Sequence, residues 1–274
     1  MEVPSAEGRR SLLPNIKLII EYEGTDYGGW QSQTNAPTVQ DALLEAIRRV
    51  TGESVKLYGS GRTDSGVHAL GQVANFLTEA TIPAERYASA LNTLLPPDIR
   101  VKCSCQAQDR FHAQFSATGK RYRYTMYNDR PGTALYRRTS WHVGQKLDRA
   151  AMAGAAVHFL GTHDFSAFQS AGGVIRETVK TVTASEITCD GPFVYFDVAA
   201  DGFLYNMVRI MAGTLVKVGR GKLASDDIPS ILASGNRDRA GYTAPAHGLC
   251  LVEVYYAGHM GQTPDVCGIF SKKL

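Results

Sequence analysis

The hydrophobic pattern of the first half predicts the order strand, helix, strand, strand, helix, strand. Thr38 is a residue type that caps helices, apolar residues then recur at helical spacing, and Gly52 ends the segment. Pro83 begins a second predicted helix, and the pair at 96–97 stops it. The predicted strands are residues 16–22, 54–58, 72–77 and 99–106.

The second half repeats this order with one additional short helix. Its predicted helices are residues 147–160, 203–218 and 226–233, and its predicted strands are residues 118–128, 178–189, 193–200 and 249–256. Two such split units are typical of ferredoxin-like folds. The pattern therefore predicts an α+β protein with two ferredoxin-like halves and mainly antiparallel sheets. It suggests an internal duplication, which is inferred from element order alone.

The 274 residues are enough for two ordinary domains. We expect residues 1–13 to be a disordered leader and residues 14–116 to form an N-terminal domain. Residues 117–257 form the second predicted domain, and residues 258–274 a flexible tail.

Composition and charge narrow the class of protein only moderately. The chain is 44% hydrophobic and 20% charged, which is typical of a folded protein, and its net charge is +3. That charge neither requires nor excludes nucleic acid, so a local basic face such as Arg137 and Arg138 matters more. Five cysteines without CxxC spacing are against a disulfide framework or a zinc site and favour a cytoplasmic protein. No window reaches the ~18 apolar residues of a membrane span.

The candidate chemistry lies in residues 59–76, a glycine-rich stretch between two predicted strands. It carries a guanidinium at Arg62, a carboxylate at Asp64 and an imidazole at His68. Glycines permit tight turns and close approach of a ligand, and loops between rigid elements are common binding or catalytic sites. By spacing alone, the commoner interpretation is that Asp64 forms a turn and Arg62 is a surface charge.

Several ordered motifs give this stretch a more specific interpretation. Gly61-Arg-Thr-Asp-Ser-Gly-Val-His-Ala69 resembles the signature of the tRNA pseudouridine synthase A family. Further blocks resemble that family in the same order over roughly residues 16–256. They are Tyr22-Glu-Gly-Thr-Asp-Tyr-Gly-Gly-Trp-Gln31, Asn92-x-Leu-Leu-Pro-Pro-Asp-Ile99, Phe111-His-Ala-Gln-Phe115, Lys120-Arg-Tyr-Arg-Tyr124, His163-Asp-Phe-Ser-Ala-Phe168, Phe203-Leu-Tyr-Asn-Met-Val-Arg-Ile-Met-Ala-Gly213 and Ala244-Pro-Ala-His-Gly-Leu249.

The resemblance implies an isomerase that converts uridine to pseudouridine in the tRNA anticodon stem-loop, at positions 38–40. An N-glycosidic bond is broken and a carbon–carbon bond is formed, without cofactor or metal. The sequence agrees, since it has no Walker loop and no GxGxxG that opens a helix. The resemblance also implies tRNA as partner, a homodimer, and no attachment to a membrane.

The same resemblance assigns roles to five residues. Asp64 matches the catalytic nucleophile, and Arg62 is expected to help extrude the target nucleotide. Tyr122 matches the active-site tyrosine that stacks on the uracil, and Arg209 matches the arginine that pairs with the catalytic aspartate. Leu249 is expected to pack beneath the base. These roles predict an active-site cleft between the two halves.

Two other readings stay open at this point. One is a non-catalytic tRNA-binding protein or folding chaperone on the same fold. The other is an aspartate-dependent hydrolase, for which His68 is an available partner. Two departures from the family pattern are Ser65, where alanine is common, and Gln114, where arginine is common; we expect the second to weaken one contact with RNA.

Overall fold

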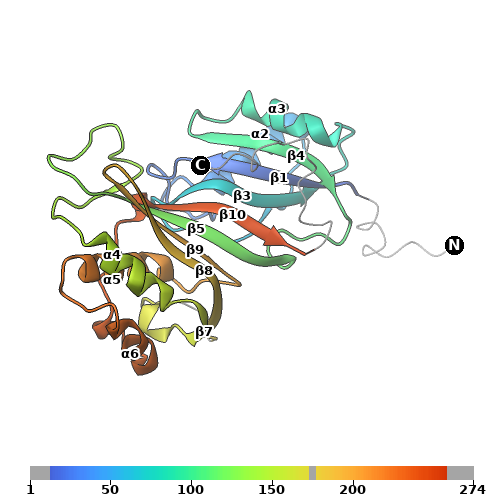
Figure 1. Ribbon diagram of the computed structural model, residues 1–274. Coiled ribbons are helices and arrows are strands. Elements are labelled where there is room, and N and C mark those ends of the chain that lie inside the picture. The colour runs from blue at the N-terminus through green and yellow to red at the C-terminus, as the bar shows by residue number, and fades with distance from the viewer. Residues whose placement is uncertain (1–12, 173–176, 258–274) are drawn as a thin grey trace. The chain divides into compact units, whose positions relative to one another are not determined.

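The computed structural model describes residues 13–172 and 177–257 (Figure 1). Two compact units divide the chain: residues 1–118 with 254–274, and residues 119–253. The predicted tail, and all but residue 13 of the predicted leader, lie outside the described residues.

The first unit is built on antiparallel strands with short helices. Strand β1 pairs with β3 on one side and with β4 on the other, and the short strand β2 pairs with β3. Helix α3 packs on β4. The elements are β1 (Asn15–Tyr22), α2 (Val39–Thr51), β2 (Tyr58–Gly59), β3 (His68–Leu77), η1 (Ala84–Arg86), α3 (Tyr87–Asn92) and β4 (Ile99–Ala107).

Helix α2 begins and ends as the sequence predicts. The Thr38 hydroxyl accepts a hydrogen bond from the Asp41 amide, at 3.2 Å. Gly52 has a φ of 78° and donates its N–H to the Arg48 carbonyl. Both contacts satisfy backbone groups that a helix end leaves open.

Three boundaries in this unit differ from the prediction. Residues 54–57 are not a strand, and the Leu57 carbonyl accepts a hydrogen bond from the Gln40 side chain at 2.9 Å instead of a strand partner. Strand β3 begins at His68, four residues earlier than predicted. Helix α3 ends at Asn92, whose side chain bonds both backbone groups of Val101, at 2.8 and 2.9 Å.

The second unit has a four-stranded antiparallel core. Strand β9 lies between β5 and β8, and β7 pairs with β8. The short strand β6 runs parallel to β5. Helix α4 packs against α5 and β8. The elements are β5 (Ala117–Tyr127), β6 (Trp141–His142), α4 (Arg149–Val157), β7 (Gly161–Asp164), η2 (Ser166–Phe168), β8 (Val179–Asp190), β9 (Phe193–Ala200), α5 (Met207–Gly219), α6 (Asp227–Ser234), η3 (Arg237–Arg239), η4 (Ala246–Gly248) and β10 (Leu249–Tyr256). Of these, residues 117–118 of β5 and 254–256 of β10 belong to the first unit.

Helix α5 begins at Met207, not at residue 203 as predicted. Asn206 has a φ of 61°, which lies outside the helical region, so the helix starts only after it. The sequence also missed β7, whose residues Gly161–Asp164 are polar and mostly exposed. The α+β class with mainly antiparallel strands is nevertheless confirmed.

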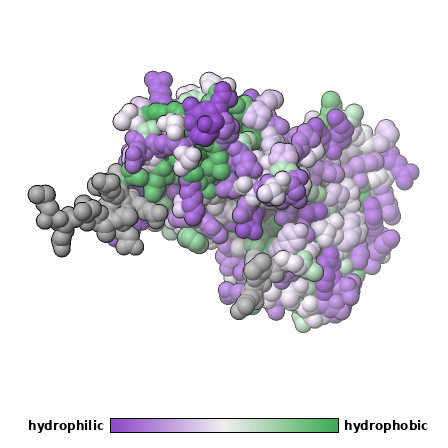
Figure 2. Space-filling model, turned by 180° about the vertical axis from the view of Figure 1, so that it is seen from behind, coloured by the Kyte–Doolittle hydropathy of each residue, from purple (hydrophilic) through white to green (hydrophobic). Residues whose placement is uncertain are grey.

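Buried apolar side chains come from every major element. Phe76 and Tyr87 meet edge to face in the first unit, and Phe159 meets Phe168 in the same way in the second. Figure 2 shows hydrophilic residues over most of the face drawn, with hydrophobic residues gathered in one area. Several large hydrophobic side chains are nevertheless exposed, above all Leu135 on the loop between β5 and β6, at 86%, and Phe115, at 79%.

Four cysteines lie among the described residues. Cys105, Cys189 and Cys250 are free thiols, and Cys103 is disulfide-bonded. The expectation that the chain has no disulfide framework stays a prediction.

Candidate active site

The candidate catalytic loop joins β2 to β3 and is closed at its base by a buried glutamine. Gln72 is fully buried and accepts a hydrogen bond from the Ser60 hydroxyl at 2.6 Å. Its amide nitrogen donates to the Gly61 carbonyl at 3.0 Å. The Ser60 amide donates to the Val73 carbonyl. The two ends of the loop are therefore fixed to each other just before Arg62.

Thr63 anchors the loop directly beside Asp64. Its side chain is 6% exposed and shares a hydrogen bond of 2.8 Å with the Tyr22 hydroxyl. Its carbonyl accepts the Trp30 amide at 3.1 Å. Both the side chain and the main chain of Thr63 are thus held by residues that precede the loop by more than thirty positions.

A tight turn begins at Asp64. The Val67 amide donates to the Asp64 carbonyl at 3.1 Å, and Gly66 adopts a φ of 78°. The Ser65 hydroxyl donates to the Tyr27 carbonyl at 3.1 Å. The serine that departs from the family pattern therefore adds a contact to the loop. Within this turn the Asp64 side chain is half-buried, while Arg62 is exposed.

Two glycines of the segment after β1 allow it to approach the loop closely. A Cβ atom on Gly24 would lie 1.9 Å from the Val67 carbonyl oxygen. A Cβ atom on Gly29 would lie 2.5 Å from the Thr63 carbonyl oxygen, and Gly29 also has a φ of 100°. No other residue type fits this contact without movement of the loop backbone.

His68 connects the loop to the end of β1. The Gly24 amide donates to His68 Nδ1 at 2.9 Å, and the imidazole is buried. His68 therefore helps to order the loop. Trp30 is also buried, with its ring centroid 6.1 Å from that of Tyr22, so it is a core residue.

Tyr122 lies on β5 in the second unit, on the buried face of that strand. Burial alternates along β5, so that Tyr122, Tyr124 and Met126 share one face, as the sequence predicts. The Tyr122 ring meets Phe203 edge to face, with centroids 5.1 Å apart. It is 9% exposed, so a small edge of the side chain reaches the surface.

Arg209 lies on the first turn of α5 and is held from two sides. Its Nε donates to the Ala244 carbonyl at 2.7 Å, and its Nη1 donates to the Asn206 side-chain oxygen at 2.8 Å. The left-handed backbone of Asn206 thus both begins the helix and presents an acceptor to Arg209. These bonds fix the direction of the guanidinium, which is half-buried.

Leu249 begins β10 and is 6% exposed. The segment before it rests on Tyr124, whose hydroxyl donates to the Pro245 carbonyl at 2.8 Å. Burial raises the pKa of Tyr124 well above its usual value, so the phenol keeps the proton that it donates. A Cβ atom on Gly248 would lie 2.6 Å from the Tyr124 ring, which shows how closely this segment packs.

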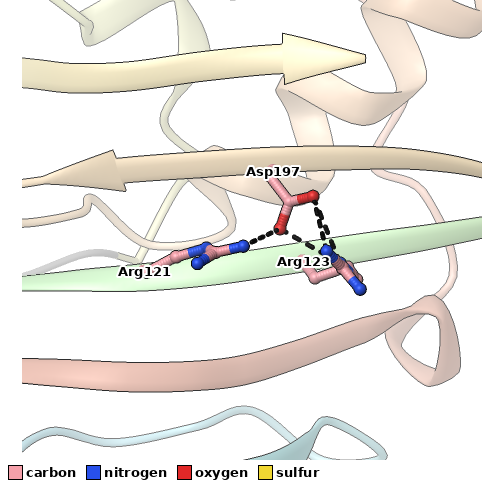
Figure 3. A network of polar contacts seen from close by, with 3 residues as sticks. All are labelled: Arg121, Arg123 and Asp197. Atoms are coloured by element: carbon pink, nitrogen blue, oxygen red, sulfur yellow. Dashed lines mark hydrogen bonds and ion pairs between the residues drawn. The ribbon is translucent and has the colours of Figure 1, made fainter. Parts of the chain in front are cut away.

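The opposite face of β5 carries an ion cluster that the sequence analysis did not identify. Asp197 on β9 is buried and accepts hydrogen bonds from Arg121 at 3.3 Å and from Arg123 at 3.0 Å (Figure 3). Arg123 also lies over the Tyr195 ring, 4.9 Å from its centroid. The sequence carried one signal for this cluster, namely an acidic residue inside the otherwise apolar segment 193–200. That segment pairs with the strand that carries the two arginines.

The predicted site residues thus fall into two sets. Arg62 and Asp64 lie on one loop of the first unit. Tyr122, Arg209 and Leu249 lie on β5, α5 and β10 in the second unit. The pairing of Arg209 with Asp64, and the cleft that would contain both, stay predictions.

The described residues contain neither a cluster of metal ligands nor a membrane-spanning helix. Among them, no group of three His, Cys, Asp or Glu side chains is placed to hold a metal ion. No described helix has the length and apolar character needed to cross a membrane.

Comparison with known proteins places these residues in a family. The family model described as tRNA pseudouridine synthase matches residues 18–116 and 155–257. The chain is 55% identical to tRNA pseudouridine synthase A of Acetivibrio thermocellus over 242 residues, covering 88% of this chain and 99% of that protein. It is 49% identical to tRNA pseudouridine synthase A of Moorella thermoacetica over 246 residues, covering 89% and 100%.

Among solved structures, the chain aligns with one titled as the archaeal box H/ACA sRNP Nop10-Cbf5 complex. The alignment has 16% identity and a TM-score of 0.35, and it covers 72% of this chain and 45% of that one. The assignment therefore rests on the sequence relatives and on the family model, which spans both units. The chain belongs to the tRNA pseudouridine synthase family, whose members are isomerases.

Proposed function

We propose that this protein isomerises uridine to pseudouridine in the anticodon stem-loop of tRNA, at positions 38–40, with Asp64 as the nucleophile. Family membership supports the tRNA pseudouridine synthase activity itself. The observation that favours Asp64 is its place at the start of a turn whose neighbours are fixed by buried hydrogen bonds. A carboxylate carried on a backbone that is fixed in this way needs little movement of the loop before it attacks.

The reaction breaks the bond between uracil N1 and ribose C1′ and forms a bond from C5 to C1′. The proton on C5 is lost and N1 gains one, so there is no net oxidation or reduction. Asp64 attacks either C6 of the base or C1′ of the ribose, or acts as the base in elimination to a glycal. In each route the base must first leave its stack, which costs a few kcal/mol.

The other site residues have roles on both sides of the target nucleotide. Arg62 is exposed beside Asp64 and, in this proposal, holds the backbone of the extruded nucleotide. Tyr122 stacks on the uracil and Leu249 packs beneath it. Arg209, already oriented by Asn206 and the Ala244 carbonyl, keeps Asp64 ionised. We further propose that the enzyme acts as a homodimer in the cytoplasm.

The deciding assay is tritium release from tRNA that carries 5-tritiated uridine. The wild type should release the label, and Asp64→Asn should not, while binding of tRNA is retained. Asparagine keeps the backbone of the turn, so loss of release reports on the carboxylate. Release by both proteins would show that another group is the nucleophile.

The alternative function, a non-catalytic tRNA-binding protein or chaperone, predicts that the wild type binds tRNA without releasing tritium.

The modified positions are assigned with tRNA transcripts in which uridine 38, 39 or 40 is replaced by cytidine, first one at a time and then all together. Release that is unaffected when all three are replaced would reject the anticodon stem-loop assignment.

A further inference from the structure

The loop between β5 and β6 lines an open cavity that none of the roles above uses. The cavity has a volume of about 440 Å³ and lies in the second unit. Backbone and side chains of residues 131–134 form part of its wall. The rest comes from Arg137, Ser140, His142 and, from η4, His247. The sequence analysis singled out Arg137 and Arg138 only as a basic cluster.

The base of this loop is fixed by one asparagine. The Asn128 side-chain nitrogen donates to the carbonyls of Val143 and Gln145, at 2.7 and 2.8 Å. Its side-chain oxygen accepts the Leu147 amide at 3.3 Å. Strand β6 adds its parallel pairing with β5. The two ends of the loop are therefore held together, as a preformed binding site requires.

Hydrogen bonds within the loop set the shape of the wall. The Tyr136 amide donates to the Thr133 hydroxyl oxygen at 3.3 Å, and the Ser140 hydroxyl donates to the Tyr136 carbonyl at 2.8 Å. Arg137 Nη1 donates to the Ala134 carbonyl at 2.9 Å. This contact orients the guanidinium, and within residues 13–172 and 177–257 its other N–H groups are available for a ligand.

The cavity has the chemistry of an anion site. The groups at its wall are a guanidinium, two imidazoles and two hydroxyls, and no carboxylate is among the lining side chains that the structure describes. His142 Nε2 contacts the Asp129 carbonyl at 2.9 Å, which holds the ring against the wall. Arginine with nearby hydroxyls binds phosphate well because its N–H groups match the spacing of the phosphate oxygens.

The cavity is joined to the proposed base-binding segment through packed rings. The Trp141 ring lies edge to face against Tyr124, with centroids 6.2 Å apart. Tyr124 in turn supports η4 through its bond to the Pro245 carbonyl. His247 therefore lines the cavity from a segment that continues two residues later as Leu249.

We propose that this cavity binds a backbone phosphate of the substrate RNA, from a nucleotide near the target uridine. The proposal rests on the proposed function, because that function supplies the RNA and places Leu249 beneath the base. It assigns Arg137 a binding role, with His142 and His247 completing the wall. The exposed Tyr136 and Leu135 at the loop surface offer apolar contact to the adjoining sugar or base.

The test compares Arg137→Ala and Arg137→Lys with a charge-matched control, Arg49→Ala. Arg49 is exposed on α2 in the other unit, and Arg137 is exposed on a loop, so none of the variants should unfold the protein. The probe is a full-length tRNA transcript in filter binding over a range of salt concentrations. Tritium release at saturating tRNA is measured in parallel.

For Arg137→Ala we expect roughly tenfold weaker binding, as for loss of one charge-assisted contact. The slope of log K against log salt should fall by about 0.7 to 0.9, the value for one phosphate contact. The rate at saturation should be unchanged, and Arg137→Lys should restore the slope. If Arg137→Ala matches Arg49→Ala in affinity and slope, the cavity does not bind phosphate. Tritium release by the wild type decides the proposed function separately.

Discussion

Replacing Gly29 with alanine should show how strongly the catalytic loop depends on its neighbouring segment. The new Cβ atom would lie 2.5 Å from the Thr63 carbonyl oxygen, whereas real contacts of this kind are not shorter than 3.0 Å. The peptide that joins Thr63 to Asp64 must therefore move by half an ångström or more. Gly29 also has a φ of 100°, which strains any other residue.

Two terms set the expected loss of stability. An alanine at positive φ costs about 1–2 kcal/mol, and forcing an extra methyl group into a packed site costs about 1–3 kcal/mol. We therefore expect Gly29→Ala to lower the free energy of unfolding by about 2–5 kcal/mol. Displacement of the Asp64 backbone should also reduce kcat, since misplacement by about 1 Å can cost as much as 100-fold.

Gly52→Ala is the matched control for this prediction. Gly52 also has a positive φ, of 78°, but nothing lies within 4 Å of its Cβ position. That variant should carry only the strain of about 1–2 kcal/mol and should keep the wild-type kcat. The measurements are urea unfolding and tritium release at a temperature where all three proteins are folded. Equal stability and equal kcat for the two variants would refute the claim that Gly29 positions the loop.

Two further substitutions test the anchor of the loop and Lys120, a half-buried lysine two residues before Tyr122. Thr63→Val removes the hydrogen bond to the Tyr22 hydroxyl and should lower the free energy of unfolding by about 1–3 kcal/mol. Thr63→Ser keeps a hydroxyl and should retain most of the wild-type stability. Equal losses for the two variants in urea unfolding would contradict this. Burial lowers the pKa of Lys120 in the folded protein below 10.5, so between the two values the unfolded chain binds more protons and stability rises with pH. In Lys120→Met the free energy of unfolding should no longer rise with pH in this range. If the profiles of the wild type and the variant are parallel up to pH 10.5, Lys120 does not cause the rise.

The sequence predicted the elements well where burial imposes a regular period. Helix α2 and strand β5 have strong apolar periodicity, and their limits agree with the prediction to within one residue. The errors lie where a local contact replaces the expected pairing. Gln40 takes the carbonyl that a strand at residues 54–57 would need, and the backbone of Asn206 delays the start of α5.

The candidate site divides in the same way. Its candidate chemical residues could be named from short motifs that resemble the family's, because each motif is a continuous stretch of sequence. Their supports could not, because they come from distant positions: Tyr22 is 41 residues from Thr63, and Gly24 is 44 from His68. Asp197 was missed for the same reason, since its partners Arg121 and Arg123 are 76 and 74 residues away.

The contacts that hold the candidate catalytic loop determine how the role of Asp64 can be tested. The described contacts that hold the loop come from Thr63, the turn at Gly66, and His68, together with the backbone carbonyl of Asp64. These contacts hold the backbone of the loop on both sides of Asp64. A substitution to asparagine leaves these anchoring residues unchanged and keeps the size of the side chain, so lost turnover in a folded protein reports on the missing negative charge. The same reasoning separates Asp64→Asn from Gly29→Ala, in which the charge is kept and its position is changed.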